Sequence, residues 1–229
     1  MDIKIIREKE DFSDTVIPKT GISAVILAGG TSSRMGTPKS MLPLGGRTVL
    51  EQVVHTFISA GVSDIRVVTG HCRESLQDII ARLPVYEVYN DQYQDGMYSS
   101  IQCGVRSVRS NASGFFIHPV DVPLISSRTI NTLIHHPGFS PSHILCPEYG
   151  GKRGHPPLIG ASFREEILAC EPPFGLSGFL HSHADEIIAA EVTDPHIRIN
   201  MNTPDDYRRV VELMRGLATD NGADIGADI

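Results

Sequence analysis

The sequence lacks several features that would place it in a common class of protein. No apolar run approaches the ~20 residues that cross a bilayer, and no basic stretch precedes an apolar core near the first residue, so we expect neither a membrane anchor nor a signal peptide. The chain has four cysteines and no Cys-x-x-Cys pair, which favours reduced thiols in a cytoplasmic protein. Its net charge of −7 leaves no general excess of positive charge, so nucleic acid is not an expected partner.

Two common phosphate-binding motifs are also absent from the glycine-rich segment at residues 29–39. The segment follows neither the G-x-x-x-x-G-K-[ST] pattern of P-loops nor the G-x-G-x-x-G pattern of dinucleotide-binding folds. It still contains what a triphosphate needs. Gly29 and Gly30 let backbone N–H groups approach an anion. Arg34 offers a bidentate guanidinium fork and Lys39 a point charge. The pattern alone leaves a second interpretation open, an ordinary surface loop rich in glycine and serine.

Short apolar runs alternate with segments of helical periodicity along the rest of the chain. This alternation predicts an α/β fold of three layers, α/β/α, around a mostly parallel sheet, with ligands at the carboxyl ends of the strands. We divide the chain into an N-terminal extension at 1–20, one domain at 21–218 and a flexible tail at 219–229. We predict strands at residues 22–27, 65–69, 85–89, 115–118, 144–146 and 187–192, and helices at 48–60, 75–82, 99–108, 127–135, 162–169, 176–183 and 203–217.

The polar loops between these elements resemble those of a known family. Residues 27–39, Leu-Ala-Gly-Gly-Thr-Ser-Ser-Arg-Met-Gly-Thr-Pro-Lys, are similar to the signature loop of the MobA-like nucleotidyltransferases, which include the molybdenum cofactor guanylyl- and cytidylyltransferases. The resemblance covers roughly residues 22–215 and implies the Rossmann-like fold of the nucleotide-diphospho-sugar transferases. Further matches follow in order: Asn90 with residues 96–101, Asp121-Val122-Pro123, Gly154-His155-Pro156-Pro157-Leu158 and Asn202-Thr203-Pro204-Asp205-Asp206.

The resemblance implies a role for each matching residue. Arg34 and Lys39 would hold the triphosphate and offset the charge that develops on the leaving pyrophosphate. Asp121 would be the third catalytic residue and would bind Mg²⁺ with Asn202, or with Asn200 in its place. His155 would contact the acceptor. The nucleotide-binding residues would be Leu27, Ala28, Gly29, Gly30, Lys39, Gly70, Asn90, Gly96, Ser99 and Ser100.

Several of these residues also have a plain structural explanation. Asp121 and Asn202 could be turn residues. Ser99 and Ser100 could cap the helix that they begin. His155 could simply be packed among its neighbours.

The implied reaction is nucleotidyl transfer from an NTP to a phosphorylated acceptor, with Mg²⁺ bound and pyrophosphate released. An acceptor phosphate is already an oxyanion at neutral pH, which agrees with the lack of any Ser-His-Asp or Cys-His arrangement. The motifs disagree about the nucleobase of the NTP. Residues 27–30 are similar to the guanylyl branch, whereas residues 96–100 and 154–157 are similar to the cytidylyl branch. We favour CTP over GTP, with molybdopterin as the acceptor and a molybdenum hydroxylase apo-enzyme as a possible partner.

Three other functions remain open at this stage. One is a transferase of the same fold that acts on a sugar or polyol phosphate. Another is a glycosyltransferase with an aspartate–metal site, although a nucleotide sugar has no γ-phosphate for Arg34 and Lys39 to hold. The third is a nucleotide-binding accessory protein without turnover, which the neutral side chains of Asn200 and Asn202 keep possible.

Overall fold

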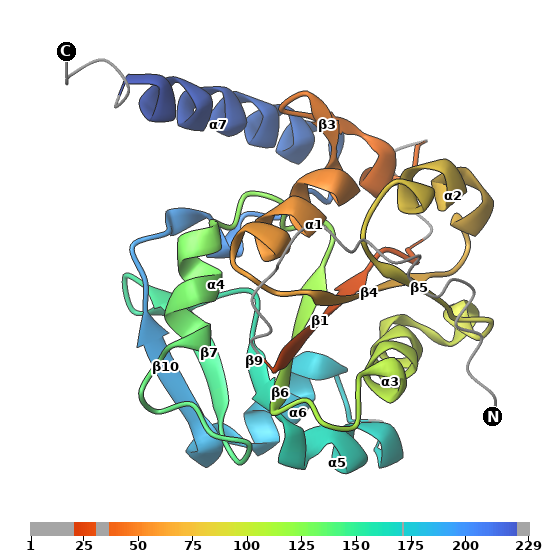
Figure 1. Cartoon of the computed structure of the whole chain (residues 1–229), viewed down its shortest axis with the longest axis vertical. Helices are drawn as coiled ribbons and strands as arrows, with labels where there is room; N and C mark the ends of the chain where they lie inside the picture. The colour runs from red at the N-terminus through yellow and green to blue at the C-terminus, as the bar shows by residue number, and fades with distance from the viewer. Residues whose placement is uncertain (1–20, 31–36, 171, 224–229) are drawn as a thin grey trace.

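The main sheet forms the centre of the molecule (Figure 1). This computed structural model describes residues 21–30, 37–170 and 172–223. The strands pair in the order β10-β7-β9-β6-β1-β4-β5, and β8 pairs with β7. The strands of this sheet are β1 (Ile22–Leu27), β4 (Asp64–Thr69), β5 (Tyr86–Tyr89), β6 (Gly114–Pro119), β7 (Ile144–Tyr149), β8 (Lys152–Arg153), β9 (Leu158–Gly160) and β10 (Ile187–Glu191).

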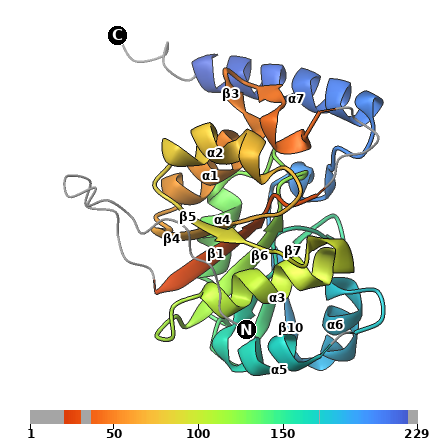
Figure 2. The same cartoon turned by 90° about the vertical axis from the view of Figure 1, so that its right-hand side faces the viewer.

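Helices cover both faces of this sheet, which confirms the predicted three layers (Figure 2). Successive side chains of β1 point to opposite faces: Ala24 and Ile26 pack in one core with α1, α2 and α4, whereas Val25 and Leu27 pack in the other with α3, α5 and α6. Both faces are buried, as expected for a strand that reads as one continuous apolar run. The helices are α1 (Val49–Ser59), α2 (Arg73–Ala81), α3 (Met97–Ser107), α4 (Ser127–Ile134), α5 (Arg164–Ala169), α6 (Leu176–Ser182) and α7 (Pro204–Ala223).

Short 3₁₀ helices occupy several of the connections. They are η1 (Lys39–Met41), η2 (Tyr93–Asp95), η3 (Ala161–Phe163), η4 (Ala184–Glu186) and η5 (Pro195–Arg198).

The central strands of the sheet are parallel. β1 pairs in parallel with β4 and with β6, and β4 pairs in parallel with β5. Their carboxyl ends therefore lie at one edge of the sheet, and the loops after Leu27, Thr69, Tyr89 and Pro119 begin there. These are the loops that carry most of the predicted site residues.

The short strands β2 (Pro43–Leu44), β3 (Arg47–Thr48), β8 and β9 were not predicted. β9 runs antiparallel between β6 and β7. Its three residues are too few to show a periodicity, and its place is set by pairing with strands distant in the sequence. β2 and β3 form a hairpin within the expected loop, since Gly45 and Gly46 adopt φ of 59° and 79° and make the tight turn.

The structure confirms the predicted starts of α1 and α7 but not the predicted end of α7. α1 starts as expected: the Thr48 hydroxyl accepts from Glu51 N and the Glu51 carboxylate accepts from Thr48 N, which is a capping box. α7 also starts at its predicted cap but continues to Ala223, beyond Leu217 and into the segment expected to be a flexible tail. Among the described residues, no helix is long and apolar enough to cross a membrane. All four cysteines are free thiols, as predicted.

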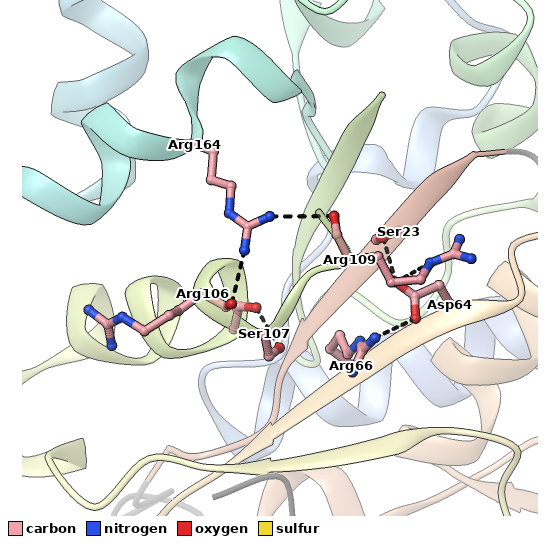
Figure 3. Close-up of polar contacts among 8 residues, drawn as sticks. Ser23, Asp64, Arg66, Arg106, Ser107, Arg109 and Arg164 are labelled. Carbon is pink, nitrogen blue, oxygen red and sulfur yellow. Dashed lines mark hydrogen bonds and ion pairs between the residues drawn. The ribbon is translucent and has the colours of Figure 1, made fainter. Parts of the chain in front are cut away.

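A cluster of charged side chains lies at the amino ends of β1 and β4, the opposite edge of the sheet from the loops after Leu27 and Thr69. Figure 3 shows its contacts. We call Ser23, Asp64, Arg66 and Arg109 the Asp64 cluster. Ser23 Oγ donates to Asp64 Oδ2, and Arg66 Nη2 donates to Asp64 Oδ1 at 2.8 Å. Arg109 Nε lies 3.3 Å from Asp64 Oδ2, close enough for an ion pair but without the geometry of a hydrogen bond. Ser23 and Asp64 are register partners at the starts of β1 and β4, so the cluster ties the amino ends of two central strands together.

Candidate active site

The backbones of the loops after β1 and β4 are in direct contact. Ala28 N donates to Val68 O at 2.9 Å. A Cβ on Gly29 would lie 3.3 Å from Gly70 N, and a Cβ on Gly70 would lie 2.8 Å from Tyr93 Cβ and 3.1 Å from Gly29 O. A side chain at Gly70 would therefore force its neighbours to move, and one at Gly29 would make a tight contact, so the two glycines let the predicted nucleotide loops meet closely. Arg34 lies outside the described residues.

Lys39 brings the predicted metal ligands together. Its ammonium lies 3.1 Å from Asp121 Oδ2 and 2.9 Å from Asn202 Oδ1. The three residues come from η1, from the loop after β6 and from the segment before α7, so folding has joined positions far apart in the chain. We call Lys39, Asp121 and Asn202 the Asp121 site. It is Asn202 that reaches Lys39, while Asn200 is exposed two positions earlier.

The backbone around Asp121 and Asn202 is held from both sides. Met201 N donates to Asp121 O at 2.8 Å, which fastens the two ligand loops to each other. Asp206 Oδ2 accepts from Asn202 N and Thr203 N at 3.0 and 2.8 Å, and Thr203 Oγ1 accepts from Asp206 N. Hydrogen bonds from Thr203 and Asn202 lower the pKa of Asp206. The Asn-Thr-Pro-Asp-Asp motif thus caps α7 and fixes the position of Asn202 in one arrangement.

Asn90, Ser99 and Ser100 are brought together, but they bond to each other. Asn90 Nδ2 donates to both serine hydroxyls at 2.9 Å, and Asn90 Oδ1 accepts from Gln92 N. Ser99 Oγ in turn donates to Gln92 O and to Gly96 O. These contacts tie the start of α3 to the end of β5, so a positioning role accounts for the three side chains here. Their contact with a nucleotide stays a prediction.

Gly96 and Gly30 are the more open members of the predicted nucleotide set. Gly96 precedes α3 with φ 100°, in a region that side chains rarely adopt, and nothing lies within 4 Å of the place where its Cβ would be. Within the part of the chain that the structure describes, nothing lies within 4 Å of a Cβ on Gly30 either. The start of α3 therefore faces space where a ligand can approach its backbone N–H groups.

His118, which the sequence analysis missed, supports the loop that carries Asp121. It is fully buried in β6, and its Nε2 lies 3.0 Å from Val122 O, so Nε2 must carry the proton. Burial, with His155 nearby, lowers the pKa of His118 to about 3 and keeps it neutral. The sequence signal for this role was one histidine within an apolar strand, because a buried polar side chain needs a hydrogen-bond partner.

A cavity of about 470 Å³ is lined in part by Pro119, two residues before Asp121 in the sequence. His155 lines it, and His155 Nδ1 is buried without a hydrogen-bond partner among the described residues. Burial lowers the pKa of His155, while Asp121 acts in the opposite direction. The structure thus brings the predicted acceptor residue to a hollow next to the predicted metal ligands. The cavity is lined by Leu27, Asp95, Met97, Tyr98, Ile101, Ile117, Pro119, His155, Phe174, Gly175, Leu176 and Ser177.

Several known proteins are similar to this chain in sequence. The chain is 30% identical over 169 residues to nicotine blue oxidoreductase of Paenarthrobacter nicotinovorans, covering 68% of this chain and 78% of that protein. It is 28% identical to a molybdenum cofactor guanylyltransferase of Xanthomonas euvesicatoria pv. vesicatoria, covering 85% and 95% of the two chains. A match at 29% identity to the bifunctional protein GlmU of Geotalea uraniireducens covers 64% of this chain but only 34% of that larger protein.

Solved structures agree with the sequence matches. A nucleotidyl transferase from Methanothermobacter thermautotrophicus superposes with a TM-score of 0.75 at 26% identity, covering 86% of this chain and 98% of the other. The MobA-like NTP transferase domain, as a family model, matches residues 24–187. That match includes the loops after β1, β4, β5 and β6, together with the His155 segment. The chain therefore belongs to the MobA-like NTP transferase family, a nucleotidyltransferase family with a Rossmann-like fold.

Proposed function

We propose that the protein transfers CMP from CTP to a phosphorylated acceptor, molybdopterin, and releases pyrophosphate. The observation that carries the proposal is the position of Lys39, whose ammonium bonds both Asp121 and Asn202 at the carboxyl edge of the sheet. A triphosphate in the neighbouring glycine loops would offer the same ammonium a more highly charged partner. Lys39 would then neutralise charge on the β- and γ-phosphates as pyrophosphate leaves.

The Asp121 site fits a small, hard divalent cation such as Mg²⁺. Asp121 Oδ2 and Asn202 Oδ1 already share one cation, the Lys39 ammonium, so both oxygens point to a common position. Mg²⁺ in phosphate-transfer sites is held by one or two carboxylates with substrate phosphates rather than by a full protein cage. Bound there, the ion would supply Lewis-acid polarisation of a phosphoryl oxygen.

The remaining residues position the reactants. The loops that meet at Gly29 and Gly70 would form one surface of the nucleotide site, and the start of α3 after Gly96 would offer backbone N–H donors. His155, kept neutral by burial, faces the acceptor cavity without adding charge. An acceptor phosphate attacks as an oxyanion, so the site needs alignment of nucleophile and leaving group more than it needs a base.

The choice of cytosine rests on sequence similarity. Residues 96–100 and 154–157 are similar to the cytidylyl branch of the family, and both flank the cavity through Met97 and His155. Residues 27–30 are similar to the guanylyl branch, and a guanylyltransferase is among the relatives, so GTP is the second candidate. A sugar or polyol phosphate is the alternative acceptor, and a molybdenum hydroxylase apo-enzyme is the proposed recipient of the product.

The test is pyrophosphate release with each of the four ribonucleoside triphosphates, with and without Mg²⁺ and with molybdopterin or a sugar phosphate as the acceptor. We expect release only with CTP, Mg²⁺ and molybdopterin together. Release with GTP would reassign the base, and release with a sugar phosphate would reassign the acceptor. If CTP or GTP binds but no triphosphate is turned over under any condition, the protein is a nucleotide-binding accessory protein and the transferase proposal fails.

A further inference from the structure

Two exposed hydrophobic side chains stand at the mouth of the acceptor cavity. Among the described residues the large hydrophobic side chains with substantial exposure are Met97 at 68%, Tyr149 at 44% and Phe174 at 93%. Met97 and Phe174 both line the cavity, although one begins α3 and the other precedes α6. Exposing a phenylalanine ring to water is unfavourable, so two such side chains around one opening indicate a surface that a ligand covers.

The backbone holds Phe174 in this outward position. Phe174 has φ 64°, in the left-handed region that a bulky residue rarely adopts. The turn is fixed on both sides: Gly175 N donates to Pro172 O at 3.0 Å, and Phe179 N donates to Gly175 O at 3.1 Å. Gly178 lies so close to Pro173 O that no side chain would fit there. A strained residue held by its surroundings at the edge of a cavity is a candidate for ligand contact.

The inner wall of the cavity is apolar and offers few polar groups. Leu27, Ile101, Ile117 and Leu176 supply aliphatic surface, and no lysine or arginine lies among the described lining residues. The Tyr98 hydroxyl is already occupied, since it donates to Ile167 O at 3.3 Å and lies 3.2 Å from Cys170 Sγ.

This wall limits what the cavity can hold. A sugar ring needs several hydrogen bonds, and the described lining offers only the Asp95 carboxylate, the Ser177 hydroxyl and His155 Nδ1 beside its aliphatic and aromatic surface. A second anionic group would meet Asp95, with no lysine or arginine among the lining residues that the structure describes. An uncharged, flat ring system matches the wall and the rim better.

We propose that Phe174 is a specificity-determining residue, whose ring covers a flat aromatic group of the acceptor, with Met97 as the opposite edge of the rim. This group fills the cavity while the acceptor phosphate lies toward Asp121. The second statement rests on the proposed function, but binding of the aromatic group does not. Ring-on-ring contact and the polarisable Met97 thioether both favour an aromatic surface over an aliphatic or sugar one.

The experiment measures binding of 1-naphthyl phosphate by its fluorescence, with N-acetylglucosamine 1-phosphate as a matched phosphate without an aromatic ring. Wild type should bind the aryl phosphate and not be competed by the sugar phosphate. Phe174→Ala should raise the Kd about tenfold, and Met97→Ala should raise it by a smaller factor. Phe174→Tyr, which keeps the ring, should stay close to wild type. Tyr149→Ala is the control for loss of an exposed aromatic away from the cavity and should change nothing.

Absence of aryl phosphate binding by wild type, equal binding in Phe174→Ala, or tighter binding of the sugar phosphate would each overturn the proposal. Thermal unfolding of each variant shows whether it is folded, and Phe174→Gly, which relieves the left-handed backbone, provides a second way to remove the ring. CTP binding is measured in the Phe174 variants and should not change. Phe174-dependent binding without pyrophosphate release from any triphosphate would leave this proposal standing and reject only the transferase function.

Discussion

The Asp64 cluster and the Asp121 site contain similar charges at opposite edges of one sheet, yet they have opposite characters. Asp64 and Arg66 are almost fully buried and find their partners within the protein. The side chains of Lys39 and Asp121 are 16% and 26% exposed, and Pro119, two residues before Asp121, lines the cavity. A buried carboxylate bonded by protein groups alone stabilises the fold. A partly exposed carboxylate bonded to an ammonium can exchange that partner for a ligand that arrives from solvent. The direction of the strands determines which of the two sites can meet a ligand, because parallel strands present their loops at the carboxyl edge.

Loss of the buried carboxylate should have the largest effect. Asp64→Ala leaves the Arg66 guanidinium buried with its charge uncompensated, although Arg66 also lies 4.0 Å over the Tyr86 ring. We expect a loss of about 3–5 kcal/mol in the free energy of unfolding. This corresponds to a fall in Tm of roughly 6–20 °C for a chain of this size.

Chemical denaturation measures the effect of Asp64→Ala, and Asp78→Ala, on the exposed surface of α2, is the control. Activity per folded molecule at low temperature should be unchanged. An equal loss of stability in Asp121→Ala would contradict the distinction between the two sites.

Loss of Lys39 should have the opposite effects: a large loss of activity and little loss of stability. Lys39→Met removes the ammonium that would neutralise the leaving pyrophosphate, so kcat/KM should fall about 10²–10³-fold. Stability should change by less than about 1 kcal/mol, since the ion pair is partly exposed. Steady-state kinetics and thermal unfolding measure the two effects, with Lys152→Met as the matched surface variant. Wild-type rates in Lys39→Met would remove this residue from the site.

His118 should affect the Asp121 loop without touching a ligand. His118→Phe preserves the buried ring but leaves Val122 O without its donor. We expect about tenfold weaker Mn²⁺ binding in the presence of CTP, as is usual when the support of a metal ligand is lost. His118→Gln retains an N–H donor and should restore most of the affinity. Equal affinities in the two variants would assign His118 to packing against Phe57 alone.

Asp194 is a third carboxylate and, like Asp64, it is bonded by protein groups. It should make the stability of the protein depend on pH. Burial alone would raise its pKa, but hydrogen bonds from His196, Ser126 and Thr129 outweigh burial and lower the pKa to about 2. A depressed folded-state pKa contributes stability above the unfolded value of 3.8, and that contribution is lost as the pH falls from about 4 to about 2.

Asp194→Asn should therefore unfold with a smaller pH dependence of stability across that window, while both proteins show parallel curves above pH 5. Urea unfolding at a series of pH values makes the comparison. Identical slopes between pH 4 and pH 2 would show that Asp194 keeps its ordinary pKa.

The carboxyl edge of the sheet was largely predictable from the sequence. Strand and helix alternation predicted the layers, and the loops after the first and fourth predicted strands contained Lys39 and Asp121, which parallel strands bring to the same edge. Asn202 came from the resemblance to the MobA-like family, and the roles of all three residues stay predictions. The helices that start near Thr48 and Thr203 were predicted from local signals as well, and capping boxes form at both starts.

The cavity and its support were not predictable, because they depend on long-range packing. β9 is defined by its pairing with β6 and β7, and the rim joins Met97 to Phe174 across a gap in sequence that no local pattern bridges. His118 carries no motif and gains its role only when the chain turns back to place Val122 O beside it. The Asp64 cluster likewise depends on the register of β1 with β4.

The most direct test of the account is the linkage between CTP and a divalent cation at the Asp121 site. Mn²⁺ binding, followed by electron paramagnetic resonance, is measured with and without CTP in wild type and in Asp121→Asn, with Asp91→Asn as the control. We predict weak binding to wild type alone, at least about tenfold tighter binding with CTP, and loss of that gain in Asp121→Asn but not in Asp91→Asn. An Mn²⁺ affinity that is unaffected by CTP, or is the same in wild type and Asp121→Asn, would contradict the assignment of this site.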